Sequence, residues 1–449
     1  RHLIMGSEKQ SELVYELDEK PPFLESFLAA IQHLLASFIA IIAPTLVIGG
    51  TLALDSEIPY LISMALIASG LGTFIQAYRP FGIGAGMICV QGTSFTFLGV
   101  ILSAGFLVKN GGGGPDEIMA LIVTICFFGS FIQIGLSQIL PKVKRAITPL
   151  VTGTVITSLG ISLIKVGMTD LAGGYGADNF GATDNLILGL FVVAVIIVMN
   201  NFNNHWIRLS SIMIGLFAGI IAATLMNKLS LADLSMSATV AMPIPFKYGF
   251  DFELMLFIPL AFLFLISSVE TTGDITANCM ISRQPIEGPS YISRIKGGVL
   301  GDGVSSMLAA LLNSFPNTTF SQNTGVIQIT GIASRHVGIY VGVILVVLGF
   351  FQGLGEILQQ IPKPVLGGAV LVMFGTVAAT GIKILASLKL DRRQIMVIAV
   401  SLGMGLGVSM VPDALGQTPE LMRNIFSSAP ATSGLSAIFL SFVLPSNDL

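Results

Sequence analysis

Several ionisable side chains lie within stretches that are otherwise apolar. Glu270 and Asp274 stand four residues apart in FLFLISSVETTGDITA, so both would lie on one face of a helix. Asp302 lies in KGGVLGDGVSSMLAALL and His33 in AAIQHLLASF. Ionisable groups inside a membrane-spanning segment are energetically costly, and by default they mark a functional site. A carboxyl group in such a low-dielectric site can exchange a proton near neutral pH, which is the chemistry that a proton-coupled symporter needs.

The alternative for each of these residues is a structural role. A hydrogen bond between helices would account for Glu270, Asp274 or His33. Asp302 is flanked by glycines near the end of its segment, so it could cap a helix instead. Glu270 lies deep in an apolar run, and a structural role therefore explains it least well.

Residues 314–335 read SFPNTTFSQNTGVIQITGIASR and lie between two strongly apolar runs. This stretch is too polar, and too interrupted by Pro316, Gly325 and Gly331, to form one continuous membrane-spanning helix. Irregular backbone at membrane depth must face protein or a water-filled cavity, because lipid cannot hydrogen-bond to it. Broken segments of this kind are typical of the substrate sites of secondary transporters.

The side chains available to such a site favour a small, planar, polar solute. Amides such as Gln322 and Asn323 donate and accept hydrogen bonds in one plane, and the Glu270 carboxylate accepts at two oxygens. Phe95 could stack on the face of a ring. An inorganic anion would instead be expected to recruit arginine or backbone N–H groups, and no arginine lies in the middle of a predicted segment.

The composition is that of a polytopic membrane protein. Of 449 residues, 53% are hydrophobic and only 10% are charged, whereas about 25% are charged in a soluble domain. A net charge of −3 argues against nucleic acid as a partner. We expect the three scattered cysteines to be core residues, neither disulfide-bonded nor metal-bound. ATP-binding, HExxH and GxSxG motifs are absent, so we expect secondary transport, no enzyme activity and no cofactor beyond a proton as coupling ion.

Windows of about 20 apolar residues predict an all-α protein with about fourteen transmembrane segments. The expected segments lie near residues 25–50, 57–78, 84–106, 117–140, 144–166, 184–203, 208–227, 252–279, 294–313, 316–332, 336–356, 365–385, 392–411 and 431–446. With residues 1–24 as a cytoplasmic tail, most of the 22 basic residues fall on the inner side, as the positive-inside rule requires. Both termini are then cytoplasmic and residues 228–250 form a periplasmic connection. Residues 1–7 are interpreted as a remnant of an expression vector.

Seven segments in each half imply inverted repeats, residues 25–227 and 251–446, because an odd number makes the second half enter the membrane from the opposite side. The third segment contains MICVQGTSFTFLGVI and the tenth SFPNTTFSQNTGVI. Each is interpreted as a short strand followed by a half-helix. The N-termini of the two half-helices, with their free N–H groups, would point at a shared central site.

The stretch QNTGVIQITGIASR resembles the signature of the nucleobase–ascorbate transporters, also called nucleobase:cation symporter-2. The matching residues are Gln322, Asn323, Gly325 and Thr330. SSVETTGDITA, RIKGGVLGDG, the Gln-His pair of the first segment and the PPF-containing N-terminus also match. The resemblance covers essentially the whole chain and is strongest to the bacterial xanthine permeases, in which Gly331 likewise follows the signature threonine.

The resemblance implies a fold of two inverted seven-segment repeats that form a core and a gate domain. The core would hold residues 25–140 and 252–356, and the gate residues 144–227 and 365–446. Members of the family are typically dimeric and proton-coupled. The resemblance therefore implies a homodimer in a bacterial inner membrane, surrounded by lipid bilayer, with a small purine as substrate.

The resemblance also assigns roles to single residues. Glu270 and Gln322 would bind the purine, and Phe95 would stack on it. Asn323 and Gly325 belong to the signature part of the site, with Asn323 acting on affinity and specificity. Proton coupling would involve Asp302, Asp274, His33 and Glu270, with Asp274 as a further essential carboxylate and His33 supporting the hydrogen-bond network of the binding site.

Ser94 stands where a xanthine permease can carry asparagine, and its shorter side chain would leave more room beside the ring. The sequence therefore predicts a proton-coupled importer of xanthine, with urate as a second candidate substrate. Two alternatives stay open: a uracil or ascorbate carrier of the same family, and an anion exchanger of the same architecture. The exchanger would need a basic residue or bare backbone in place of Glu270.

Overall fold

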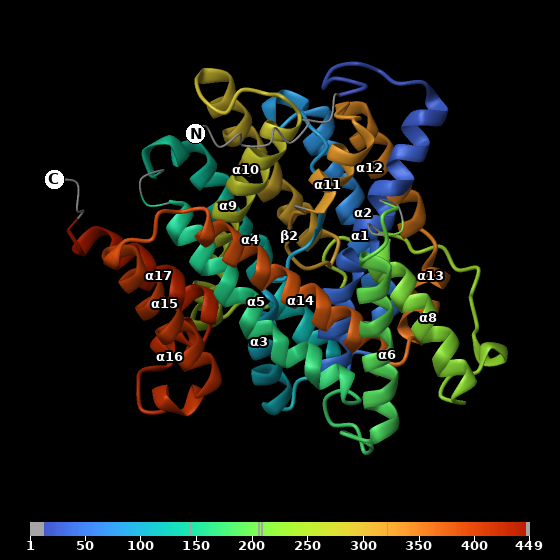
Figure 1. The fold of residues 1–449 in the computed structure, drawn as a ribbon. Coiled ribbons are helices and arrows are strands. Elements are labelled where there is room, and N and C mark those ends of the chain that lie inside the picture. Colours follow the sequence, from blue (N-terminus) through green and yellow to red (C-terminus); the bar gives the residue numbers. More distant parts are fainter. Residues whose placement is uncertain are drawn as a thin grey trace, which may run out of the picture.

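A computed structural model describes residues 13–143, 146, 148–204, 207, 210–320 and 322–445, apart from the side chains of Asp233, Gln322 and Ile329. The chain is mainly helical, with two short strands near its centre (Figure 1). The expected N-terminal tail, residues 1–24, therefore lies partly outside the described residues. Its described part packs against the junction of α11 and α12, where the backbone N–H of Val14 and of Tyr15 donate to the carbonyl oxygen of Gly331.

Each expected segment overlaps a helix of the structure. Those of the first half are α1 (Phe23–Thr51), α2 (Ile58–Tyr78), α3 (Leu98–Asn110), α4 (Pro115–Val143), α5 (Pro149–Leu171), α6 (Thr183–Asn200) and α8 (Ser211–Leu225). Those of the second half are α9 (Leu254–Ile281), α10 (Pro289–Leu311), α11 (Gln322–Thr330), α12 (Arg335–Gly349), α14 (Lys363–Ala386), α15 (Arg392–Met410) and α17 (Ala429–Val443). Local signals start several of them, such as the capping box of Asp391 and Gln394 before α15.

Within the described residues, eight helices are long and apolar enough to cross a membrane alone, or nine if the bent pair α16 (Glu420–Phe426) and α17 is one span. The number is lower than fourteen partly because α3 and α11 are half-helices that follow strands. Helices α3, α8 and α12 are shorter apolar helices of 10–17 residues. The third and tenth segments thus have the strand and half-helix form that the sequence predicts.

The eleventh segment is shorter than expected. The sequence predicts a helix over 336–356, but α12 ends at Gly349 and a separate helix, α13 (Gln352–Gln359), follows. Phe351 is extended between them, and it forms a β-bridge with Val240 of the long connection before α9. The connection takes up backbone hydrogen-bonding groups there, so the helix cannot continue.

Strands β1 (Gln91–Thr93) and β2 (Asn317–Thr319) form an antiparallel pair in which Gly92 faces Thr318. The pairing continues at both ends, where Ser94 N donates to Pro316 O at 2.8 Å and Phe320 N donates to Val90 O at 2.9 Å. Extended backbone in the interior of a membrane protein needs such partners. The pair brings the third and tenth segments together at the centre of the molecule (Figure 1).

The packing of helices repeats between the two halves. When the helices of the halves are matched in order, the contact of α2 with α12 corresponds to that of α10 with α4. The contact of α6 with α8 likewise corresponds to that of α15 with α17, and the contact of α6 with α14 to that of α15 with α5. This correspondence is what two halves related by a pseudo-two-fold axis would show.

The helices pack in two groups. Helices α1, α2, α9 and α10 contact the strand pair, and α4 and α12 pack on these helices, whereas α5, α6, α8, α14, α15 and α17 pack mainly on one another. We call the first group the core and the second the gate. The helices α1 and α9 of the core contact the gate helices α8, α14, α5 and α17. The residue boundaries of the two groups stay a prediction.

Candidate substrate site

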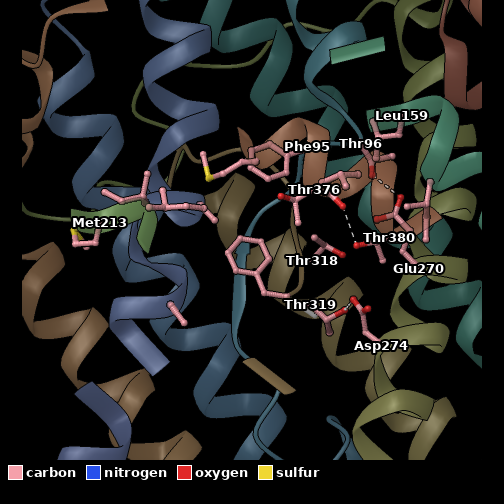
Figure 2. Close-up of a pocket in the computed structure, with 18 of the residues that line it drawn as sticks. Phe95, Thr96, Leu159, Met213, Glu270, Asp274, Thr318, Thr319, Thr376 and Thr380 are labelled. Atoms are coloured by element: carbon pink, nitrogen blue, oxygen red, sulfur yellow. Dashed lines mark hydrogen bonds between the residues drawn. The ribbon is translucent and has the colours of Figure 1, made fainter. Parts of the chain in front are cut away.

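A cavity of about 370 Å³ lies between the core and the gate. The core contributes α1, α9, β2 and the linker after β1, and the gate contributes α5, α8 and α14. Figure 2 shows the side chains around it. A cavity of this size accommodates a small ligand, and pockets of this kind hold a few polar groups that orient the ligand.

Glu270 and Asp274 of α9 both line the cavity, as their spacing predicts. Each accepts a hydrogen bond from a threonine of a crossing segment. Thr96 Oγ1 donates to Glu270 Oε1 at 2.6 Å, and Thr319 Oγ1 donates to Asp274 Oδ2 at 2.7 Å (Figure 2). Both carboxyl groups are half-buried, so the remaining oxygen of each can serve a ligand or a proton.

Phe95 also lines the cavity, next to Thr96. Its ring meets Phe374 of α14 edge to face, with 5.2 Å between the ring centroids and 89° between the ring planes. The contact joins a core segment to a gate helix and fixes the orientation of the Phe95 ring. One ring of the core is thus held at the wall of the cavity.

Ser94 does not line this cavity. It is buried, and its hydroxyl accepts a hydrogen bond from Thr96 N at 3.2 Å. Ser94 is therefore linked to the site only indirectly, because Thr96 bonds both to Ser94 and to Glu270. The proposed effect of its size on the space beside a ring stays a prediction.

Asp302 is fully buried on α10 and does not line the cavity. Its Oδ2 accepts hydrogen bonds from Gln133 Nε2 of α4 at 2.6 Å and from Thr271 Oγ1 of α9 at 2.7 Å. Thr271 is the neighbour of Glu270 in sequence, so Asp302 is tied to the helix that carries both cavity carboxyl groups. Asp302 does not cap a helix, because it lies in the interior of α10, which runs from Pro289 to Leu311.

His33 of α1 and Asn323 of α11 form a buried pair. Asn323 Nδ2 lies 3.0 Å from His33 Nδ1 and donates to the carbonyl oxygen of His33 at 3.2 Å. An amide nitrogen only donates, so this contact is a hydrogen bond when His33 Nδ1 carries no proton. The pair joins α11 to α1 at the core.

The other signature residues lie in α11 or at its end. Gln322 is the first residue of this helix, and its side chain lies outside what the structure describes. Gly325 lies within the helix and is half-buried. Thr330 Oγ1 donates to Val326 O at 2.8 Å, and Gly331 ends the helix with a φ of +68°, a conformation that glycine adopts without strain. Thr330 and Gly331 thus have a visible role in the backbone.

Sequence reasoning missed the threonines that surround the carboxyl groups. Thr96, Thr318 and Thr319 line the cavity from the core, and Thr376 and Thr380 line it from α14 of the gate. The first three belong to the TSFTF and NTTF stretches, so their clustering in two matching segments was the available signal. Gln133, which binds Asp302, gave no such signal.

A second cavity, of about 190 Å³, lies on the other side of Thr96 and Leu159, which line both cavities. Hydroxyl and amide groups are frequent in its wall, among them those of Ser103, Ser162 and Asn424. Thr96 comes from the core and Leu159 from α5 of the gate. The two side chains therefore separate the cavities where the two groups of helices meet.

Within the described residues, no three His, Cys, Asp or Glu side chains gather as a metal site would require. The three cysteines are buried core residues.

A family model described as a permease family matches residues 24–414. The chain is also 44% identical over 442 residues to the xanthine permease XanP of Escherichia coli strain K12, which covers 97% of this chain and 96% of that protein. The chain belongs to the nucleobase–ascorbate transporter family. XanQ, a second xanthine permease of the same strain, is 41% identical over 439 residues, covering 97% of this transporter and 94% of the relative. These relatives are permeases, not enzymes.

The fold of the transporter is also that of a solved structure with little sequence similarity. The transmembrane domain of the cyanobacterial bicarbonate transporter BicA aligns with a TM-score of 0.61 at 16% identity, covering 90% of this chain and 99% of that chain. Both chains therefore share the architecture of inverted repeats with a core and a gate. At this level of identity the likeness concerns the fold alone.

Proposed function

We propose that the protein is a proton-coupled symporter that imports a purine base, with xanthine as the main substrate and urate as a second one. The observation that carries this proposal is the pair of carboxyl groups, Glu270 and Asp274, in a cavity between core and gate. The relatives that are named xanthine permeases support the choice of solute.

The cavity suits a purine in shape and polarity. The free oxygen of Glu270 can accept a hydrogen bond from a ring N–H, and Phe95 can contact the face of the ring. Gln322 is the first residue of α11, where its amide would complete the hydrogen bonding of the purine edge, and Asn323 would act from beside it through its bonds to His33. A cavity of about 370 Å³ is large enough to hold one bicyclic base.

Proton coupling would use Asp302, Asp274 and His33 around the site. Asp302 contacts α9 through Thr271, and Asp274 contacts β2 through Thr319, so a proton on either group changes hydrogen bonds that hold the cavity wall. Protonation also removes the cost of a bare buried charge while the loaded core moves. A proton is the coupling ion, and no other cofactor is invoked.

Transport would follow alternating access, with the core moving against the gate around the cavity. The protein would lie in a bacterial inner membrane as a homodimer, with both termini in the cytoplasm. Thr96 and Leu159 would close the path on the periplasmic side in the conformation seen here.

Purified protein in liposomes tests the proposal. Radiolabelled xanthine should accumulate when an inward proton gradient is imposed, and an uncoupler should stop the accumulation. The proposal would be refuted if xanthine uptake were no higher than in empty liposomes, or if it were the same with and without the proton gradient. Competition by unlabelled xanthine, urate, uracil and ascorbate then separates the purine hypothesis from a uracil or ascorbate carrier.

The Glu270→Gln variant should lose most purine binding, because Thr96 donates to one oxygen of Glu270 and an amide that keeps this bond turns its NH2 group, a donor, toward the ring N–H. Glu253→Gln is the matched control, since Glu253 precedes the same helix and is exposed. Equilibrium binding of xanthine to the two purified variants measures the difference. Wild-type affinity in Glu270→Gln would remove this residue from the site.

The Asp302→Asn variant should abolish proton-driven uptake while it weakens xanthine binding much less, because Asp302 lies outside the cavity. Uptake under a gradient and equilibrium binding are compared on one preparation. Equal loss of both would assign Asp302 a structural role.

An anion exchanger of the same architecture is the second candidate, since BicA shares the fold. The cavity is lined by two carboxyl groups, and no Lys or Arg occurs among its described lining residues. A small inorganic anion finds no cationic partner among these described lining residues, so bicarbonate should not compete with xanthine.

A further inference from the structure

Three arginines converge at one end of the core, beside the N-terminal segment and away from both cavities. Arg79 follows the last residue of α2, Arg294 lies in the second turn of α10, and Arg335 begins α12. A Cβ atom placed on Gly86 would lie 3.3 Å from Arg79 Cδ, 3.5 Å from Arg294 Nη1 and 3.7 Å from Arg335 Nη1. Three cationic side chains therefore approach one point beside Gly86, which is itself buried.

Part of each guanidinium group binds neutral oxygen atoms of the core. Arg79 Nη2 donates to Ser293 Oγ at 2.8 Å, Arg294 Nη1 donates to Ala85 O at 2.7 Å, and Arg335 Nη2 donates to Tyr78 O at 2.6 Å. These bonds hold the arginines in place, yet they do not neutralise the charges. Each guanidinium has five N–H donors, so further donors stay available.

The positive charge of the cluster has little compensation among the described residues. The one ion pair there joins Arg335 Nη1 to Asp18 Oδ1 at 3.7 Å, and the Asp18 side chain is 82% exposed. Arg335 Nε is buried without a hydrogen-bond partner. Burial, followed by repulsion from Arg294 and Arg335, lowers the pKa of Arg79. A bound anion stabilises such a cluster, because it offsets the repulsion between neighbouring positive charges.

The surface next to the cluster is apolar and aromatic. Phe81 is fully exposed, with a φ of +53° that points to a constrained turn, and Tyr78 is 53% exposed. Tyr78 stacks on Phe74, with 5.5 Å between ring centroids, and Ile292 of α10 is 45% exposed. Exposed aromatic residues at the ends of membrane-spanning helices lie at the level of the lipid headgroups. An anion bound by the arginines at that level would be a lipid phosphate.

We propose that Arg79, Arg294 and Arg335 bind the phosphate group of an anionic membrane phospholipid, whose acyl chains lie against Phe81 and Ile292. Arginine forks match the oxygen atoms of a phosphate and remain charged at every physiological pH. The bound lipid ties α2, α10 and α12 together at this end of the core. The site is independent of the purine cavity.

The first experiment measures thermal unfolding of the purified protein in a neutral detergent at fixed ionic strength. Added phosphatidylglycerol should raise the midpoint by several degrees, whereas phosphatidylcholine or inorganic phosphate should not. The rise should vanish in Arg294→Gln and persist in Lys296→Gln, which removes the same charge from the same helix two residues away. An equal rise in both variants would overturn the site, and a rise with inorganic phosphate alone would overturn the lipid assignment.

A second pair of variants tests the same point without removing any arginine. Gly86→Asp places a carboxylate among the three guanidinium groups, and aspartate and asparagine are the side chains that best tolerate the φ of +71° at Gly86. We expect Gly86→Asp to unfold at a higher temperature than Gly86→Asn without lipid, and to lose the response to phosphatidylglycerol that Gly86→Asn keeps. Equal midpoints and equal lipid responses in the two variants would overturn the proposal.

Discussion

Each carboxyl group of the site is held by a hydroxyl or amide donor from a distant segment. Thr96 binds Glu270, Thr319 binds Asp274, and Thr271 with Gln133 binds Asp302. A hydrogen bond to a charged group contributes more than one between neutral groups. The donors therefore decide which oxygen atoms face a ligand, although the carboxyl groups are the conspicuous residues.

The Thr96→Val variant should weaken xanthine binding about tenfold or more, because a lost hydrogen bond to a charged group costs about 1.5–3 kcal/mol. Valine keeps the shape of the side chain, and Glu270 keeps its place on α9. Isothermal titration of xanthine into the purified variant measures the change.

Thr376→Val is the control for this measurement. Thr376 lines the same cavity, but its hydroxyl donates to Val372 O at 2.8 Å within α14. We expect an affinity within about twofold of wild type. A similar loss of affinity in both variants would contradict this prediction. It would show that removing any hydroxyl group from the cavity wall weakens xanthine binding, whether or not that hydroxyl binds Glu270.

At the scale of elements, glycines allow helices and strands to approach closely. Gly92 of β1 faces the ring of Phe320, and Gly160, Gly367 and Gly381 lie where the backbones of α5 and α14 meet. Small residues at such contacts are a general feature of membrane helix pairs. The contact of α5 with α14 is the central one of the gate, so its glycines position the wall that faces the core.

The Gly381→Ala variant should lower the unfolding temperature of the protein by a few degrees. The added Cβ would lie 2.8 Å from Cα of Thr157 and closer still to its backbone nitrogen, so α5 and α14 must move apart. Overpacking of this kind costs about 1–3 kcal/mol. Gly375→Ala, on the same helix with nothing within 4 Å, should leave the midpoint unchanged or slightly raised. The reverse order would contradict the packing of these two helices.

At the scale of the whole molecule, the two groups of helices meet at two cavities of unequal size. Thr96 of the core and Leu159 of the gate form the wall between them. A transporter that exposes its site to one side at a time needs a barrier of this kind, made by residues of both moving parts.

The Leu159→Ala variant should join the two cavities. We expect a membrane-impermeant thiol reagent to label the Thr380→Cys variant from one side of the membrane, and the Ser103→Cys variant from the other. Adding Leu159→Ala should make the Thr380→Cys variant reactive from both sides. Vesicles of opposite orientation and gel-shift detection give the measurement, with the three buried native cysteines as background.

Leu163→Ala is the control for this experiment, since Leu163 lines the second cavity but not the first. It should leave the one-sided labelling unchanged. Two-sided labelling of the Thr380→Cys variant before any change at Leu159 would mean that no barrier stands between the cavities.

The sequence by itself determined the membrane class, the series of segments, the broken third and tenth segments and the carboxyl groups Glu270, Asp274 and Asp302. These features are local. An apolar run is costly to expose to water and a charge is costly to place in lipid, and neither cost depends on the rest of the chain. The end of α12 at Gly349 was missed, because the pairing of Phe351 with Val240 that ends it involves a distant loop.

Only the tertiary structure decided which groups meet. Glu270 lies 174 residues from Thr96, and Asp302 lies 169 residues from Gln133, yet each pair is in hydrogen-bond contact. It also showed Ser94 bound to Thr96, away from the cavity, and three arginines around Gly86. Such contacts depend on how helices cross, and helix packing is set by side chains that are far apart in the chain. A side chain's type can be read from the sequence, but its partner is fixed only by the fold.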